Sequence, residues 1–251
     1  MLSALKYAVN KSLSPIGLAI TKVDGHGWND VANFIPFKET MEKARKAGMS
    51  IGDYVDTVMN GVPDMTRNTI NNMKSLGVFS KPMGTVVEIG PGTGRYLEKT
   101  LKAARSSRYE IYETAAPWSA YLVKEYSVTA QPTNGYALTH TADGSADMVQ
   151  AHKVFSGVPF MATCCYWHEM SRVIGPGGWA VFDVVTERCL AGDTLRIWAE
   201  SGIRNGSYPS VMPREVAVSF FIGKGFTLAG SFIVPMPPGT TELLVFKRVG
   251  C

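Results

Sequence analysis

The sequence predicts an α/β fold, a three-layer sandwich whose doubly wound, seven-stranded sheet is mostly parallel and has an antiparallel last strand. Two observations support this prediction. An apolar run, a glycine-rich turn and a helical segment follow one another between residues 85 and 101, and strand-like and helical segments then alternate to residue 249. Helical segments come first, so we divide the chain into an extension, residues 1–80, and a main domain, residues 81–251.

The extension is predicted to contain three short helices, at residues 37–47, 50–60 and 64–77. Ser50 and Asp53 form an approximate capping box for the second helix, and Asp64 can cap the third. Such short helices cannot form a core by themselves, so we expect a lid or flank beside the ligand-binding edge of the sheet. Four large side chains could line a pocket there, although core packing is the better interpretation of each: Trp28, Phe34, Tyr54 and Met65.

The glycine-rich turn lies in TVVEIGPGTGRYLEKT, residues 85–100. Glu88 stands near the end of the apolar strand, and three glycines follow it: Gly90, Gly92 and Gly94. Without a Cβ, these residues let the backbone turn tightly and lie against a ligand at the amino end of the next helix. The spacing is G-x-G-x-G, and Arg95 occupies the position where the dinucleotide fingerprint G-x-G-x-x-G has its third glycine.

This stretch resembles the first motif of class I S-adenosylmethionine-dependent methyltransferases, which reads apolar-apolar-Glu/Asp-apolar-Gly-x-Gly-x-Gly. The downstream elements follow in the order of that family, so the resemblance covers residues 80–250. It implies S-adenosylmethionine as the cofactor. It also implies that Glu88, Gly90, Gly92 and Gly94 contact that cofactor.

A second strand is predicted at YEIYE, residues 109–113, with Glu113 at its carboxyl end, 23 residues after Gly90. A carboxylate at this distance can accept hydrogen bonds from both ribose hydroxyls of a nucleoside. The resemblance places Thr114 beside the adenine. It also places Asn134 and Gly135, in the loop after the short third strand, where the adenine edge is read.

The fourth strand, DMVQAH, brings Gln150 and His152 to the carboxyl edge of the sheet, where open α/β sheets bind ligands. Family members that methylate amino groups of nucleobases or glutamine commonly carry a Pro-Pro pair at this point, and QAHKVF has none. An imidazole suits removal of a hydroxyl proton, because its pKa lies near working pH. We therefore expect Gln150 to contact the cofactor and His152 to act as the general base; a purely structural His152 stays an open alternative.

The remaining elements continue the alternating pattern. Helices are predicted at residues 117–125, 160–174 and 212–225, with a fifth strand after the Pro-Gly-Gly turn at residues 176–178. Two last strands, joined through PPGT, suit an antiparallel pair. Within this family, His152 favours transfer to a hydroxyl oxygen, and the basic amphipathic amino terminus resembles that of bacterial methyltransferases that modify sugars of cell-surface glycans. Alternatives are a hydroxyl or carboxylate of a small natural product and, from another class, a non-catalytic interaction protein with this fold.

Composition limits the partners and the setting. The net charge of +4 comes without a dense basic stripe, so no nucleic-acid partner is expected. The four cysteines show no zinc spacing, so we expect no metal and a reduced, cytoplasmic setting. No apolar run reaches the ~18 residues of a membrane span. Residues 1–20 are amphipathic and basic, which leaves weak contact with the inner membrane surface open, and a homodimer is open too.

Overall fold

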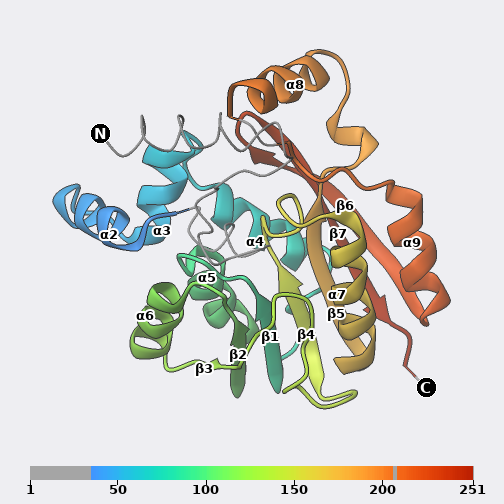
Figure 1. The fold of residues 1–251 in the computed structure, drawn as a ribbon. Coiled ribbons are helices and arrows are strands. Elements are labelled where there is room, and N and C mark those ends of the chain that lie inside the picture. Colours follow the sequence, from blue (N-terminus) through green and yellow to red (C-terminus); the bar gives the residue numbers. More distant parts are fainter. Residues whose placement is uncertain (1–34, 206–207, 251) are drawn as a thin grey trace, which may run out of the picture.

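The structure is a computed structural model that describes residues 35–205 and 208–250. The basic segment at residues 1–20, Trp28 and Phe34 lie outside these residues. Seven strands form one sheet in the order β3-β2-β1-β4-β5-β7-β6 (Figure 1). Their bounds are β1 Thr85–Ile89, β2 Arg108–Tyr112, β3 Thr129–Ala130, β4 Ala146–Ala151, β5 Ile174–Val184, β6 Phe226–Met236 and β7 Gly239–Arg248. Only the pairings of β7 with β5 and β6 are antiparallel, so the predicted fold is confirmed.

The order of the strands reverses beside β1, which pairs with β2 on one side and with β4 on the other. Ile89, the last residue of β1, lies opposite Tyr112 of β2 and Ala151 of β4. The segments that follow these three strands therefore leave the sheet at one edge. This is the switch point at which doubly wound sheets bind their ligands.

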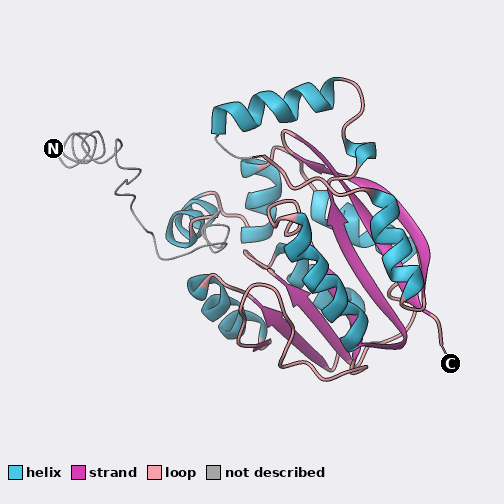
Figure 2. Ribbon diagram, turned by 45° about the vertical axis from the view of Figure 1, so that its right-hand side comes forward, coloured by secondary structure: helices cyan, strands magenta, loops and turns pink. Residues whose placement is uncertain are grey.

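Helices cover both faces of the sheet (Figure 2). One face packs against α4 (Met65–Ser75), α5 (Arg95–Ala104) and α6 (Ala116–Tyr126), and the other against α7 (Phe160–Val173) and α9 (Arg214–Gly223). Side chains alternate between the two faces along each strand, and this alternation explains both layers. Val86 packs in the hydrophobic cluster with α4, α5 and α6, and Val87 and Ile89 pack in the cluster with α7 and α9. Trp167 of α7 stands beside Phe221 of α9, with ring centroids 6.1 Å apart.

The extension forms α2 (Phe37–Lys46), then α3 (Ile51–Tyr54), which continues as a π-helical turn, Val55–Met59, before α4. Ser50 caps α3 as predicted, because its Oγ accepts a hydrogen bond from the Asp53 amide at 3.1 Å. Tyr54 and Met65 are buried, in agreement with core packing. The buried side chains of α4 share one hydrophobic cluster with Val86 of β1, so this helix is part of the main core.

Asp64 does not cap α4 in the way we predicted. Its backbone is left-handed, with φ +59°, and its side chain makes no capping bond but pairs with Arg67 at 2.8 Å. A helix cap needs an extended backbone to direct its oxygen at the first amides. Asp56 of the π-helical turn takes over this role, since its Oδ2 accepts a hydrogen bond from the Thr66 amide at 2.9 Å.

The connection after β5 contains a short 3₁₀ helix, Glu187–Cys189, and α8, Asp193–Asn205. Figure 1 shows α8 beyond the ends of the last two strands. Trp198 anchors it there: its indole lies so close to Gly239 that a Cβ on this glycine would come within 2.4 Å of Nε1. Within the described part of the chain, no helix is long and apolar enough to cross a membrane.

Candidate active site

The glycine turn connects β1 to α5, and all three glycines have positive φ, at +59°, +53° and +78°. A Cβ at Gly90 would come within 2.8 Å of Val154, and one at Gly94 within 2.3 Å of Leu122. Gly92 differs, because a Cβ there would meet nothing within 4 Å. Packing therefore requires glycine at the first and third positions. The middle position faces open space, where a ligand can lie against the backbone.

Glu113 follows β2 and faces this turn. Its Oε2 accepts a hydrogen bond from the Gly92 amide and its Oε1 one from the Ala115 amide, both at 2.7 Å. Burial raises the pKa of Glu113, and these amides oppose that effect. A carboxylate has about four acceptor positions, so about two remain for the hydroxyls of a ligand. Thr114, the next residue, is exposed.

The loop before β4 carries Asn134 and Gly135. Asn134 Oδ1 accepts hydrogen bonds from the amides of Tyr136 and Ala137, at 3.1 and 2.9 Å, which makes an Asx turn. Gly135 has a φ of +85°. The side-chain oxygen of Asn134 thus stabilises the loop, and its amide group is left for a ligand.

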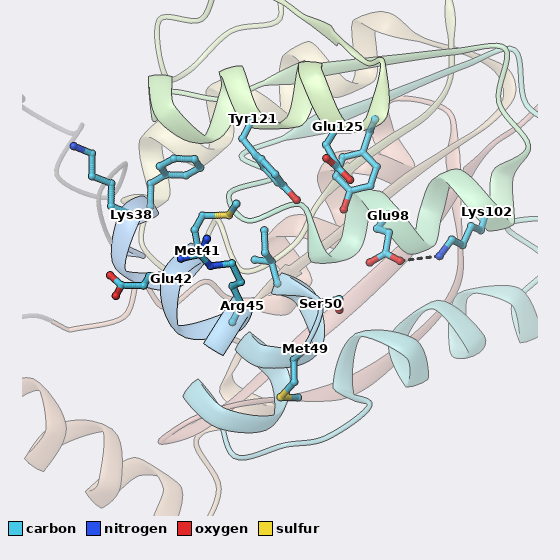
Figure 3. Close-up of a pocket in the computed structure, with 14 residues that line it drawn as sticks. Lys38, Met41, Glu42, Arg45, Met49, Ser50, Glu98, Lys102, Tyr121 and Glu125 are labelled. Carbon is cyan, nitrogen blue, oxygen red and sulfur yellow. Dashed lines mark hydrogen bonds and ion pairs between the residues drawn. The ribbon is translucent and has the colours of Figure 1, made fainter. Parts of the chain in front are cut away.

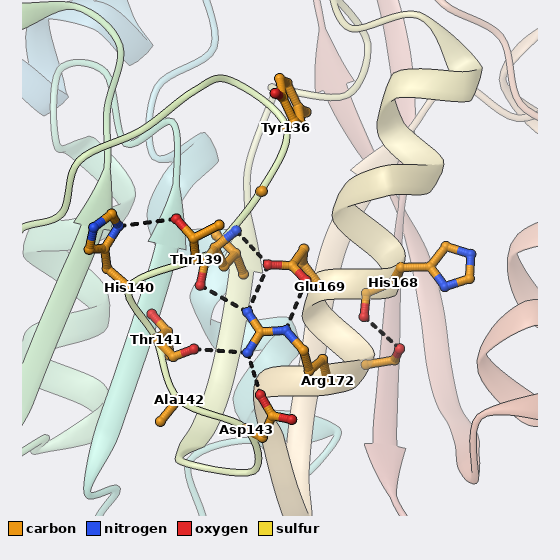
Figure 4. A network of polar contacts seen from close by, with 12 residues as sticks. Tyr136, Thr139, His140, Thr141, Ala142, Asp143, His168, Glu169 and Arg172 are labelled. Carbon is orange, nitrogen blue, oxygen red and sulfur yellow. Dashed lines mark hydrogen bonds and ion pairs between the residues drawn. The ribbon is translucent and has the colours of Figure 1, made fainter.

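Arg172 of α7 holds the second half of this loop in place (Figure 4). Its guanidinium donates to the Leu138 carbonyl at 3.0 Å and the Thr141 carbonyl at 3.1 Å, and to the Glu169 carboxylate at 2.7 Å. Glu169 in turn accepts a hydrogen bond from the Leu138 amide at 2.8 Å, and its bond to Arg172 lowers the pKa of Glu169. The sequence analysis missed this pair, although Glu and Arg three residues apart on a helix are a usable signal.

Glu88 and Gln150 are the two residues of the predicted cofactor set that lie in the protein interior. They lie opposite each other on β1 and β4, and both are fully buried on the face covered by α5. The Tyr109 hydroxyl donates to Glu88, and the Gln150 amide donates to Tyr109 at 2.9 Å and to Thr100 at 3.1 Å. Burial raises the pKa of Glu88 to about 7. These hydrogen bonds satisfy buried polar groups of both side chains, and contact of Glu88 and Gln150 with a cofactor stays a prediction.

His152 follows β4 at the edge predicted for it, and its ring stacks on Tyr96 of α5. The two ring centroids are 4.0 Å apart and the planes differ by 9°. Neither imidazole nitrogen, nor the Tyr96 hydroxyl, has a hydrogen-bond partner among the described residues. Burial lowers the pKa of His152 to about 3, against the attraction of Asp183. Burial thus favours the neutral imidazole at working pH, in contrast to the pKa near working pH that was expected from the sequence.

A buried ion pair borders His152. Lys153 has a left-handed backbone, with φ +61°, which is a strained conformation for a side chain of this kind. Its amide donates to Asp183 Oδ1 at 2.6 Å, and its ammonium lies 2.9 Å from Oδ2, to which Thr241 also donates at 2.6 Å. Burial alone would raise the pKa of Asp183, but Lys153 holds it below its usual range. This cluster fixes the ends of β4, β5 and β7 to one another.

A groove of about 920 Å³ lies elsewhere, between α2 and the helices α5 and α6 (Figure 3). Aromatic and sulfur-containing side chains line it together with charges of both signs: Phe37, Met41, Met49, Tyr121, Tyr126, Lys38, Glu42, Arg45, Glu98, Lys102 and Glu125. It contains neither a glycine of the turn, nor Glu113, nor His152. We therefore place the candidate active site at the sheet edge and not in this groove.

Comparison with solved structures identifies the fold. N-methyltransferase NodS from Bradyrhizobium japonicum, in complex with S-adenosyl-L-homocysteine, superposes with a TM-score of 0.54 and 14% identity over 73% of this chain and 87% of its own. An O-methyltransferase family protein from Burkholderia thailandensis superposes with a TM-score of 0.55 and 14% identity, over 97% of this chain and 83% of its own. The [4+2]-cyclase SpnF superposes with a TM-score of 0.55 and 13% identity, over 74% of this chain and 81% of its own. The chain has the class I methyltransferase fold.

No protein-family model and no curated protein sequence matches the chain, so the likeness is one of fold. Proteins with this fold methylate different atoms, and SpnF is named for a cyclisation. Function must therefore be argued from the site. In the described ranges, no three His, Cys, Asp or Glu side chains are grouped so that they could hold a metal ion.

Proposed function

We propose that the protein is an S-adenosylmethionine-dependent methyltransferase. One observation carries the proposal: Gly92 faces open space directly beside the Glu113 carboxylate, to which its amide is bonded. A methyl-sized addition would fill that space, and the carboxylate keeps acceptor capacity for ribose hydroxyls. The residues at the sheet edge therefore fit a nucleoside cofactor. The backbone of the glycine turn would lie against the cofactor, and Glu113 would bind its ribose. Thr114, Asn134 and Gly135 would lie beside its base.

The bound cofactor supplies a methyl group that is already activated by a positively charged sulfur. The protein then has to orient the acceptor in line with that group, exclude water and accept a proton. We propose that His152 accepts the hydroxyl proton of the acceptor. With a pKa of about 3 it is a weak base, but it is always in its accepting form. A hydroxyl becomes strongly acidic as its oxygen is alkylated, so a weak base suffices. The nearby Asp183 carboxylate favours the imidazolium that forms.

We propose a hydroxyl of a sugar or glycan as the acceptor, since the edge after β4 has an imidazole where methyltransferases of nucleobase or glutamine amino groups commonly have a Pro-Pro pair. One observation favours a second candidate. Because the pKa of His152 is so low, an acceptor that is already ionised, such as the carboxylate of a small natural product, would need no base at all. The two candidates differ in whether His152 is needed for turnover.

A methyl-transfer screen tests this proposal. The protein is incubated with tritium-labelled S-adenosylmethionine and a panel of sugars, glycolipids, phenols and small carboxylic acids, and label in each acceptor is counted. We expect label in a hydroxyl compound. Label only in carboxylic acids would favour the second candidate. Binding of the cofactor without transfer to any member of the panel would favour an interaction protein with this fold.

The proposed setting is the cytoplasm, without nucleic acid, and with weak contact between residues 1–20 and an anionic membrane. Two lysines in that segment give little attraction, so the contact should be electrostatic. Co-sedimentation with vesicles of anionic and of neutral lipid tests it: binding should need the anionic lipid and disappear as salt rises. A homodimer is also proposed, and sedimentation velocity would show it.

A further inference from the structure

The extension reaches the candidate active site through one buried ion pair. Asp56, in the π-helical turn of the extension, lies 2.8 Å from the Nη1 atom of Arg95, the first residue of α5. The side chains of Asp56 and Arg95 are only 2% and 11% exposed. Thr66 donates to both carboxylate oxygens of Asp56, through its amide at 2.9 Å and its hydroxyl at 3.0 Å. The carboxylate is thus held by α4 of the extension and by α5, the helix that follows the glycine turn.

The contacts continue from Arg95 to His152. The Arg95 guanidinium carbon lies 5.1 Å from the centroid of the Tyr96 ring, within cation–π distance. Tyr96 in turn stacks on the His152 imidazole at 4.0 Å. Neither His152 nitrogen is hydrogen-bonded within the described structure, so no polar bond fixes the ring. The stacked Tyr96 ring lies nearly parallel to the plane of the imidazole.

We propose that Tyr96 is a positioning residue that orients the His152 imidazole, and that Asp56 holds Tyr96 in place through Arg95. The inference rests on His152 acting in methyl transfer, as proposed above. It assigns the extension a role in aligning the proton acceptor. A misplacement of a catalytic group by about 1 Å costs roughly 100-fold in rate, so a ring that orients the imidazole matters for turnover.

The charges around His152 agree with this arrangement. Arg95 of α5 and Lys153 after β4 disfavour protonation of the imidazole, and Asp183 of β5 favours it. Each cation has its own carboxylate, Asp56 for Arg95 and Asp183 for Lys153. Loss of Asp56 would leave the Arg95 cation buried without a partner, which is strongly unfavourable. Arg95 would then move toward solvent and leave the Tyr96 ring.

Nuclear magnetic resonance of the four histidines tests the proposal without a known acceptor. The His152 signals are assigned by their absence in His152→Gln. In the wild-type chain, the ring current of Tyr96 should displace the His152 ring protons, and they should not titrate between pH 5 and 8. Tyr96→Phe keeps the ring and should keep both properties. Tyr96→Leu removes the ring, so the displacement should vanish, and the His152 pKa should rise only as far as the smaller side chain admits water to the imidazole.

Asp56 has a matched control in Asp53, an acidic residue of the same segment that is 49% exposed and lies 3.7 Å from Lys99. Asp56→Asn should shift the His152 signals, and Asp53→Asn should leave them in place. Unchanged His152 signals in Asp56→Asn, or full turnover in a folded Tyr96→Leu variant, would overturn the proposal. If Tyr96→Leu does not fold, equal effects of the two aspartate substitutions would overturn it.

Binding of S-adenosylhomocysteine by calorimetry separates this inference from the proposed function. Tyr96→Leu should bind it within about threefold of the wild-type affinity, while turnover on the acceptor found in the screen should fall roughly 100-fold. If the wild-type chain does not bind it at all, the proposed function fails. The resonance shifts would still decide whether Tyr96 orients the imidazole.

Discussion

Gly92→Ala isolates the requirement for a bare backbone at the middle of the glycine turn. The variant keeps the amide that bonds Glu113 and adds one methyl group into the open space beside it. The left-handed backbone, φ +53°, costs a residue with a side chain about 1–2 kcal/mol. A stability loss of this size lowers Tm by roughly 2–8 °C in a chain of this length. The folded fraction at 25 °C is hardly affected, so any loss of ligand binding comes from the added methyl group.

Gly144→Ala is the matched control. Gly144 has a similar backbone, φ +63°, also has nothing within 4 Å of a Cβ, and lies in the loop before β4, at the opposite edge of the sheet from the glycine turn. Both variants should lose similar stability by calorimetry. Only Gly92→Ala should lose affinity for S-adenosylhomocysteine, by more than about tenfold, or ~1.4 kcal/mol. Equal affinities in the two variants would refute our assignment of the open space at Gly92 to the cofactor.

Two further predictions concern buried groups with shifted pKa values. Burial raises the pKa of Glu88 to about 7, so the free energy of unfolding should fall as pH rises from about 4.5 through 7. Between pH 5 and 8 this fall should amount to about 3 kcal/mol in the wild-type chain and should be absent in Glu88→Gln. Urea unfolding measures it, and the same pH dependence in both chains would contradict the prediction. His152 has its pKa lowered to about 3, so its stability contribution is present above about 6.5 and is lost toward pH 3. The difference in unfolding free energy between wild type and His152→Gln should change by up to about 1.4 kcal/mol per pH unit between pH 6 and 4. A difference that does not depend on pH would show an exposed imidazole.

The fold and the glycine turn were predictable because their signals are local. A β-branched run followed by glycines at positive φ specifies a strand and a turn, and the carboxylate of Glu113 stands directly after the next strand. Glu88 and Gln150 could not be placed in the same way. The pairing of β1 with β4 puts the two side chains on one face of the sheet, and the position of α5 makes this face interior; neither can be read from the sequence of one strand.

Long-range contacts explain the other differences between the sequence-based predictions and the structure. The cap of α4 comes from Asp56, ten residues before Thr66, instead of from the adjacent Asp64, because the chain turns through a left-handed residue there. The low pKa of His152 follows from its burial, to which the stacked ring of Tyr96, 56 residues away in the sequence, contributes. The sequence indicates which residues reach the sheet edge, and tertiary packing decides their ionisation.

The central claim is that the sheet edge binds S-adenosylmethionine, and isothermal titration of the full chain tests it most directly. S-adenosylhomocysteine and NAD are titrated separately into the same preparation. We predict binding of S-adenosylhomocysteine at one site per chain and no measurable heat with NAD, because the turn has Arg95 in place of the third glycine of the dinucleotide fingerprint. Binding of NAD, or of neither compound, would contradict the account.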